Sequence, residues 1–178
     1  MLTDELLQRY IRRRGPFVYH LTDAENIGSI LAGGLIPGAG ESQFDPHLIR
    51  PGHIYLCNRV TATRSLGGHF DCSWGDAAFQ VDIRMLEVIR FNADEEYWRG
   101  YEFSHGHVVA PDWKSVKNAF PKMDEPEQVY SCLIDFGSIA YRGAIPRESL
   151  RLLRVTRRGF RLGRPRATCE PRPLFGPG

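Results

Sequence analysis

The chain has 178 residues, an apolar fraction of 42% and a formal net charge of +2. These values favour one globular domain with a sizeable core, and no run approaches the ~18 apolar residues that cross a bilayer. The N-terminus lacks the apolar stretch of a signal peptide, so we expect no membrane partner.

Cysteine usage bears on the compartment. Four cysteines lie at positions 57, 72, 132 and 169, without a CxxC spacing. Scattered thiols are typical of a reducing compartment, so we expect a cytoplasmic protein whose cysteines serve mainly in packing. The run His105-Gly106-His107 has no cysteine nearby, and we therefore expect no metal site.

Charge is distributed unevenly along the chain. Residues 151–178 hold eight arginines and one glutamate, so the rest of the chain is net acidic. Basic tails of this kind bind nucleic acids or keep a protein soluble, and the sequence leaves both roles open. Residues 156–178 combine Gly, Pro and Arg without periodicity, which predicts a flexible basic tail after a domain spanning 1–155.

The first predicted elements are a helix, a strand and a second helix. Apolar residues share one helical face over 2–13, and Gly15-Pro16 ends this helix. The run Phe-Val-Tyr predicts a strand over 17–20 that ends in a histidine. A helix over 23–33 follows, with a capping residue at its start and Gly33-Gly34 at its end.

The rest of the chain predicts mainly strands. After a polar loop at 37–52, the expected elements are strands at 53–57, 77–83 with an extension through 85–89, 129–134, 138–141 and 150–155, and a short helix at 60–67. Because the strands are mostly not separated by helices, the pattern favours an α+β fold over a doubly wound sheet.

The segment around His20 resembles a known motif. A strand ending in His20, then Thr22 and a helix closed by Gly33-Gly34, is similar to the opening motif of the ADP-ribosyltransferase superfamily in its His-Tyr-Glu branch, which includes diphtheria-toxin-like and poly-ADP-ribosyltransferases. The resemblance implies an α+β fold with split antiparallel β-sheets and flanking helices. It also implies that His20 and Thr22 hold the nicotinamide ribose and amide of NAD.

Two later segments extend the resemblance. Residues 52–57 look like the family's second strand, which implies that the ring of Tyr55 stacks on nicotinamide. Residues 137–150 look like the closing strand and the Ile-Pro-x-Glu exit that follows it. The family places its catalytic glutamate at the start of the closing strand, and in this alignment that position is Ser138.

A second alignment supplies a carboxylate. If the closing strand is 128–134, Glu127 stands at its start and becomes the catalytic candidate, with Glu125 and Asp135 as alternatives. Such a carboxylate would stabilise the oxocarbenium-like state that forms when the nicotinamide–ribose bond breaks. The sequence leaves the choice between the two alignments open.

The resemblance implies an NAD-dependent ADP-ribosyltransferase that releases nicotinamide and modifies a nucleic-acid base or a protein side chain. We expect Glu127, His20 and Tyr55 to be catalytic, and His20, Thr22, Tyr55 and Arg64 to contact NAD, because a guanidinium suits a pyrophosphate. The basic tail favours nucleic acid as the acceptor, as in the DNA-modifying toxins of the branch. By the same resemblance, an antitoxin or immunity protein is a candidate partner of this chain. One alternative is a non-catalytic module that binds NAD or nucleic acid. The other is an NAD-dependent RNA 2′-phosphotransferase, which resembles the same fold but relies on an extra N-terminal domain, and we expect no room for that domain before residue 17.

Overall fold

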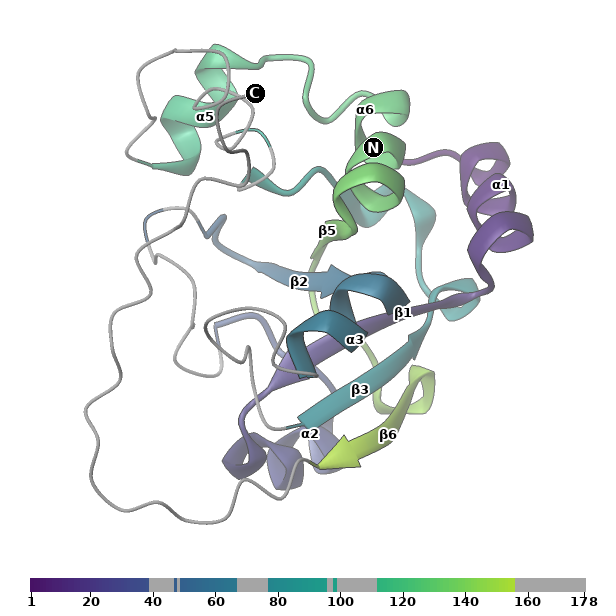
Figure 1. The fold of residues 1–178 in the computed structure, drawn as a ribbon. Coiled ribbons are helices and arrows are strands. Elements are labelled where there is room, and N and C mark those ends of the chain that lie inside the picture. Colours follow the sequence, from purple (N-terminus) through teal and green to yellow (C-terminus); the bar gives the residue numbers. More distant parts are fainter. Residues whose placement is uncertain (39–46, 48, 67–76, 96–97, 99–111, 156–178) are drawn as a thin grey trace.

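The computed structural model of the protein describes residues 1–38, 47, 49–66, 77–95, 98 and 112–155, and Figure 1 shows its fold. The strands are β1 (Phe17–Thr22), β2 (His53–Cys57), β3 (Ala77–Asp82), β4 (Phe91–Asn92), β5 (Ser138–Arg142) and β6 (Leu150–Val155). The helices are α1 (Asp4–Arg14), α2 (Ile27–Gly33), α3 (Arg59–Leu66), α5 (Trp113–Ala119), α6 (Pro126–Ser131) and the π-helical η4 (Cys132–Phe136). Single 3₁₀ turns are η1 (Ala24–Asn26), η2 (Ile83–Met85), η3 (Val88–Arg90) and η5 (Arg147–Ser149). An α+β fold is therefore confirmed.

One predicted strand and one predicted strand extension are wrong. Residues 85–89 do not extend β3, because the chain turns through η2 and η3 before β4. Residues 129–134 are helical, in α6 and η4. Pro126 occupies the first turn of α6, where its missing N–H costs nothing, and buried residues then recur at helical spacing at Val129 and Leu133. Because buried residues lie on several sides of this short helix, its sequence has the apolar composition that is also typical of a buried strand.

The strands form one antiparallel sheet with the order β4-β5-β2-β1-β3-β6. β1 joins β3 through six partner pairs and β2 joins β5 through five, whereas β1 and β2 are joined by the single pair Tyr19–Cys57. Beyond this pair the backbone ladder between β1 and β2 stops. We call the part of β1 and β2 beyond this pair, which holds His20 on β1 and Tyr55 on β2, the seam.

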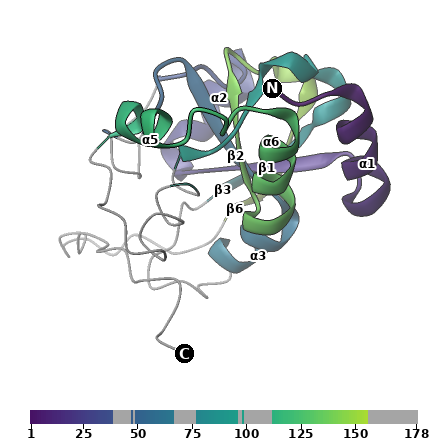
Figure 2. The ribbon, with the colours of Figure 1, turned by 90° about the horizontal axis from the view of Figure 1, so that it is seen from above.

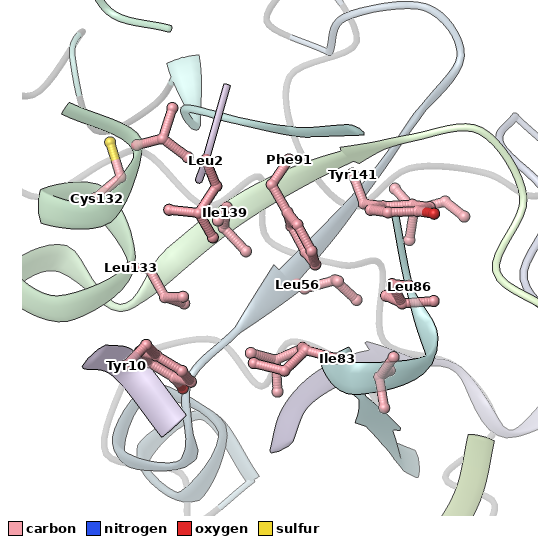
Figure 3. Packing of buried hydrophobic residues seen from close by; sticks show 14 of the residues in the cluster. Leu2, Tyr10, Leu56, Ile83, Leu86, Phe91, Cys132, Leu133, Ile139 and Tyr141 are labelled. Atoms are coloured by element: carbon pink, nitrogen blue, oxygen red, sulfur yellow. The ribbon is translucent and has the colours of Figure 1, made fainter. Parts of the chain in front are cut away.

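The buried side chains of the sheet form two clusters. The larger one contains Leu56 and Ile139 together with residues of α1, η2, β4 and η4 (Figure 3). The smaller one joins Tyr19 and Cys57 to Ala62 of α3. Figure 2 shows α3 and α2 on opposite sides of the strands. Because side chains alternate along a strand, buried side chains lie on both faces of the sheet, and the seam is where the pairing of β1 with β2 ends.

Gly137 connects η4 to β5 where no side chain fits. Its φ is +91°, and an added Cβ would lie 2.3 Å from Oγ1 of Thr61 and 2.8 Å from Nδ2 of Asn58. The Gly137 carbonyl accepts a 2.7 Å hydrogen bond from the Asn58 N–H, and the Gly137 N–H donates to the carbonyl of Cys132 at 2.8 Å. These contacts fix Ser138, the first residue of β5, beside the start of α3.

Candidate functional site

His20 lies at the seam and bridges it. Its Nδ1 is 3.1 Å from the backbone carbonyl oxygen of Tyr55. Since a carbonyl only accepts, Nδ1 carries the proton in this contact, and Nε2 of the neutral ring is then a hydrogen-bond acceptor. Burial lowers the pKa of His20 and outweighs the opposing effect of the Tyr55 carbonyl, so the neutral ring is favoured. The structure therefore holds this imidazole in one tautomer.

Thr22 lies at the end of β1, two residues beyond His20, and is buried. Its Oγ1 accepts a 3.2 Å hydrogen bond from Nδ2 of Asn26. This bond joins the end of β1 to η1, which gives Thr22 a structural role at the entry to α2. The expected contact of Thr22 with NAD stays a prediction.

The hydroxyl of Tyr55 is fixed from two sides. It donates a 2.7 Å hydrogen bond to Oε2 of Glu95 and accepts a 2.9 Å hydrogen bond from the backbone N–H of Arg50. Burial raises the pKa of Tyr55 well above its ordinary value, and the negative charges of Glu95 and Asp94 raise it further. The phenol therefore stays protonated, and its ring is held in one orientation beside the seam.

A buried charged network lies behind Tyr55. Glu95 has no exposed surface, and its carboxylate forms an ion pair with Arg50, which is 8% exposed. Arg50 also contacts Asp124, at 3.2 Å, and Asp124 forms an ion pair with Lys117 of α5. We call these four residues, Arg50, Glu95, Lys117 and Asp124, the Arg50 network. It joins the segments before β2, after β4 and around α5.

The two carboxyls of the Arg50 network have opposite pKa shifts. Burial raises the pKa of Glu95 to about 7, although the charge of Arg50 and the Tyr55 hydrogen bond work against this rise. For Asp124, burial also acts to raise the pKa, but the Lys117 hydrogen bond and the Arg50 charge are together stronger and lower it. Asp124 is therefore ionised at neutral pH, while Glu95 titrates near it.

Ser138 lies at the start of β5, opposite Cys57 of β2. It is half-buried, and its hydroxyl donates a hydrogen bond to Oδ2 of Asp94, which is 4% exposed. Asp94 and Glu95 are consecutive, so one short segment after β4 contacts both Ser138 and Tyr55. A carboxylate thus reaches the start of β5 from another part of the chain.

The carboxylates proposed from the second alignment lie elsewhere. Glu127 is exposed in the first turn of α6, and Glu125 and Asp135 are exposed as well. Because 129–134 is helical and β5 begins at Ser138, the alignment that put Glu127 at the start of a strand is wrong. The predicted strand therefore no longer supports a catalytic role for Glu127, and that role stays a prediction.

Other predicted features lie outside the described residues. The backbone of Arg64 belongs to α3, but its side chain is outside the described part, as are residues 156–178 of the predicted tail. No helix within the described ranges is long and apolar enough to cross a membrane.

The sequence-based reasoning missed Arg50, Asp94, Glu95 and Asp124. The available signal was the acidic run that begins at Asp94, after β4. Because β4 has only two residues, the sequence shows no alternating pattern that would mark it as a strand. Comparison with protein-family models, with curated proteins and with solved structures finds no match to this chain. The geometry of the site is therefore the main guide to the function of this chain.

Proposed function

We propose that the protein is an NAD-dependent ADP-ribosyltransferase. The observation that supports this best is the placement of the three motif positions on neighbouring strands: His20 on β1, Tyr55 on β2 and Ser138 at the start of β5. The resemblance assigns the same three strands to NAD. The seam lies between the first two of them, and it would receive the nicotinamide riboside end of NAD.

The side chains at the seam suit such a ligand. Nε2 of His20, as an acceptor, would take a hydrogen bond from a ribose hydroxyl. The Tyr55 ring would pack on the planar, positively charged nicotinamide, and its fixed hydroxyl limits the entropy that this contact costs. Polar groups held in place in a partly apolar site are typical of sites that orient a hydroxyl-rich ligand.

In the proposed reaction the bond between ribose C1′ and the nicotinamide nitrogen breaks, and its electron pair leaves with nicotinamide. A nucleophilic atom of the acceptor then forms a bond to C1′ and loses its proton to solvent. The basic composition of residues 151–178 supports a nucleic-acid acceptor, although a protein side chain fits the same chemistry.

Cellular setting is part of the proposal. Cys57 and Cys132 are buried free thiols, which supports the proposed reducing, cytoplasmic compartment. If the acceptor is nucleic acid in the host cell, an antitoxin or immunity protein would be the natural partner.

Melting and turnover with NAD test this function. Ligand that binds only the folded state stabilises it by about 2.7 kcal/mol at 100 times Kd, so we expect NAD to raise the melting temperature and nicotinamide to be released. His20→Ala should remove most of the shift. The matched control is His53→Ala on β2, because His53 contacts Pro51 and Asn92 rather than the seam. An unchanged melting curve in millimolar NAD would refute the proposal.

The rival function is a binding module without chemistry. The absence of a glutamate at position 138 favours it. A protein that is stabilised by NAD but releases no nicotinamide, with any nucleic acid or protein offered as acceptor, would identify this module and exclude the transferase.

A further inference from the structure

We infer that Ser138 and Asp94 act as one unit in the reaction: the Ser138 hydroxyl contacts the nicotinamide ribose, and the Asp94 carboxylate acts through that hydroxyl. This inference rests on the proposed function. It assigns a role to a serine where the resemblance leads one to expect glutamate, and it makes Asp94 a positioning residue.

Burial separates the roles of the two side chains. Asp94 is 4% exposed, so its carboxylate has little access to a ligand, whereas Ser138 is half-buried at the end of a strand. The Ser138 O–H donates to Oδ2 of Asp94, which leaves the lone pairs of Oγ as acceptors. A ribose hydroxyl could donate to this oxygen, as it would donate to a glutamate.

Position supports the same inference. Ser138 pairs with Cys57, two residues from Tyr55 on β2, and Glu95, the neighbour of Asp94, binds the Tyr55 hydroxyl. His20 contacts the Tyr55 carbonyl from the other side of the seam. The charge of Asp94 also raises the pKa of Tyr55, which places this carboxylate electrostatically close to the ring. The pair therefore lies beside Tyr55, whose backbone carbonyl contacts His20.

The chemical role is electrostatic. As the C1′–nicotinamide bond breaks and its electrons leave with nicotinamide, positive charge develops on the ribose ring. The negative charge of Asp94 polarises the Ser138 hydroxyl, and Oγ then accepts more strongly from the ribose 2′-hydroxyl and stabilises that positive charge. No proton is removed from the ribose, and the acceptor's proton goes to solvent.

A double-mutant cycle tests whether the two residues act as a unit. We expect Ser138→Ala and Asp94→Asn each to lower kcat for nicotinamide release on the order of 10²-fold, with the NAD-induced melting shift retained. The double variant should be no slower than the slower single variant, because removing either partner already disables the pair. Effects that multiply in the double variant would overturn the inference.

Moving the carboxylate provides an independent test. Ser138→Glu combined with Asp94→Asn returns a carboxylate to position 138, and we expect kcat to recover at least about 10-fold over Asp94→Asn alone. Ser138→Gln in the same background is the control and should give no recovery. A structural role for Asp94 would predict equal rates in both combinations, and that result would overturn the inference.

Failure of the pair and failure of the proposed function are distinguishable. If the unmutated protein releases nicotinamide and both single variants keep its rate, the pair is wrong and the transferase stands. If the unmutated protein is not stabilised by NAD, or releases no nicotinamide, both proposals fall. If Asp94→Asn melts far below the unmutated protein, the test uses Ser138→Ala and Ser138→Cys instead, because both keep Asp94 and remove the hydroxyl. Full activity in both variants would overturn the inference.

Discussion

The hydroxyl of Tyr55 donates a 2.7 Å hydrogen bond to Glu95, a carboxylate with no exposed surface that is also paired with Arg50. Tyr55 is the aromatic ring expected to contact nicotinamide. Its far end is therefore anchored in a buried charged network, and the orientation of the ring depends on residues that a ligand in the seam would not touch.

Removing the Tyr55 hydroxyl should destabilise the fold. Tyr55→Phe leaves the buried Glu95 carboxylate and the Arg50 N–H each without one partner, and we expect a loss of about 1–3 kcal/mol in the free energy of unfolding. Urea denaturation measures it. Tyr10→Phe is the control, because the Tyr10 hydroxyl makes only a 3.4 Å contact with the Phe17 carbonyl and its loss should cost less. Equal losses of unfolding free energy in the two variants would mean that the hydrogen bond to Glu95 does not stabilise the fold more than the weak Tyr10 contact does.

Glu95 should make stability depend on pH. Its pKa rises from an ordinary 4.5 to about 7 on folding, so the folded state binds the proton more tightly than the unfolded state. This contribution is fully present below pH 4.5 and is lost as the pH rises through about 7. Between pH 5 and 8 the unmutated protein should lose on the order of 2–3 kcal/mol relative to Glu95→Gln.

Unfolding by urea at a series of pH values measures this difference. The comparison with Glu95→Gln removes the contributions of the other titrating groups, including Asp124, whose lowered pKa acts in the opposite direction on acidification. Parallel pH curves for the two proteins would show that Glu95 is ionised throughout the range.

A methyl group at position 137 should displace the start of β5. Gly137→Ala combines a φ of +91° with a contact of 2.3 Å to Thr61, and we expect a loss of more than about 2 kcal/mol in the free energy of unfolding. Gly52→Ala is the matched control, since Gly52 has a φ of +76° but nothing within 4 Å of the added Cβ. It should cost about 1 kcal/mol. If Gly137→Ala costs no more than the control, the contact with α3 is not tight.

The sequence by itself determined most of the regular elements. The apolar face of α1, the β-branched and aromatic runs of β1 and β2, and the glycines at the end of α2 are local patterns, and local patterns can be read without knowing the fold. The α+β class follows from them. The segment 129–134 failed because a short buried helix and a buried strand share the same apolar composition, although Pro126 offered a helix-start signal.

Only the tertiary structure decided which charged groups meet. Arg50 and Asp124 are 74 positions apart, and no periodicity links them. Asp124 also accepts a hydrogen bond from the N–H of Ala93, just after β4, so this contact requires the sheet order that places β4 beside β5 and β5 beside β2. Asp94 likewise reaches Ser138 across 44 positions. A buried charge is costly unless it is paired, so burial makes these pairings important for stability. Because burial is a property of the folded chain, local sequence determines the strands, whereas the fold determines which carboxylates lie beside the seam.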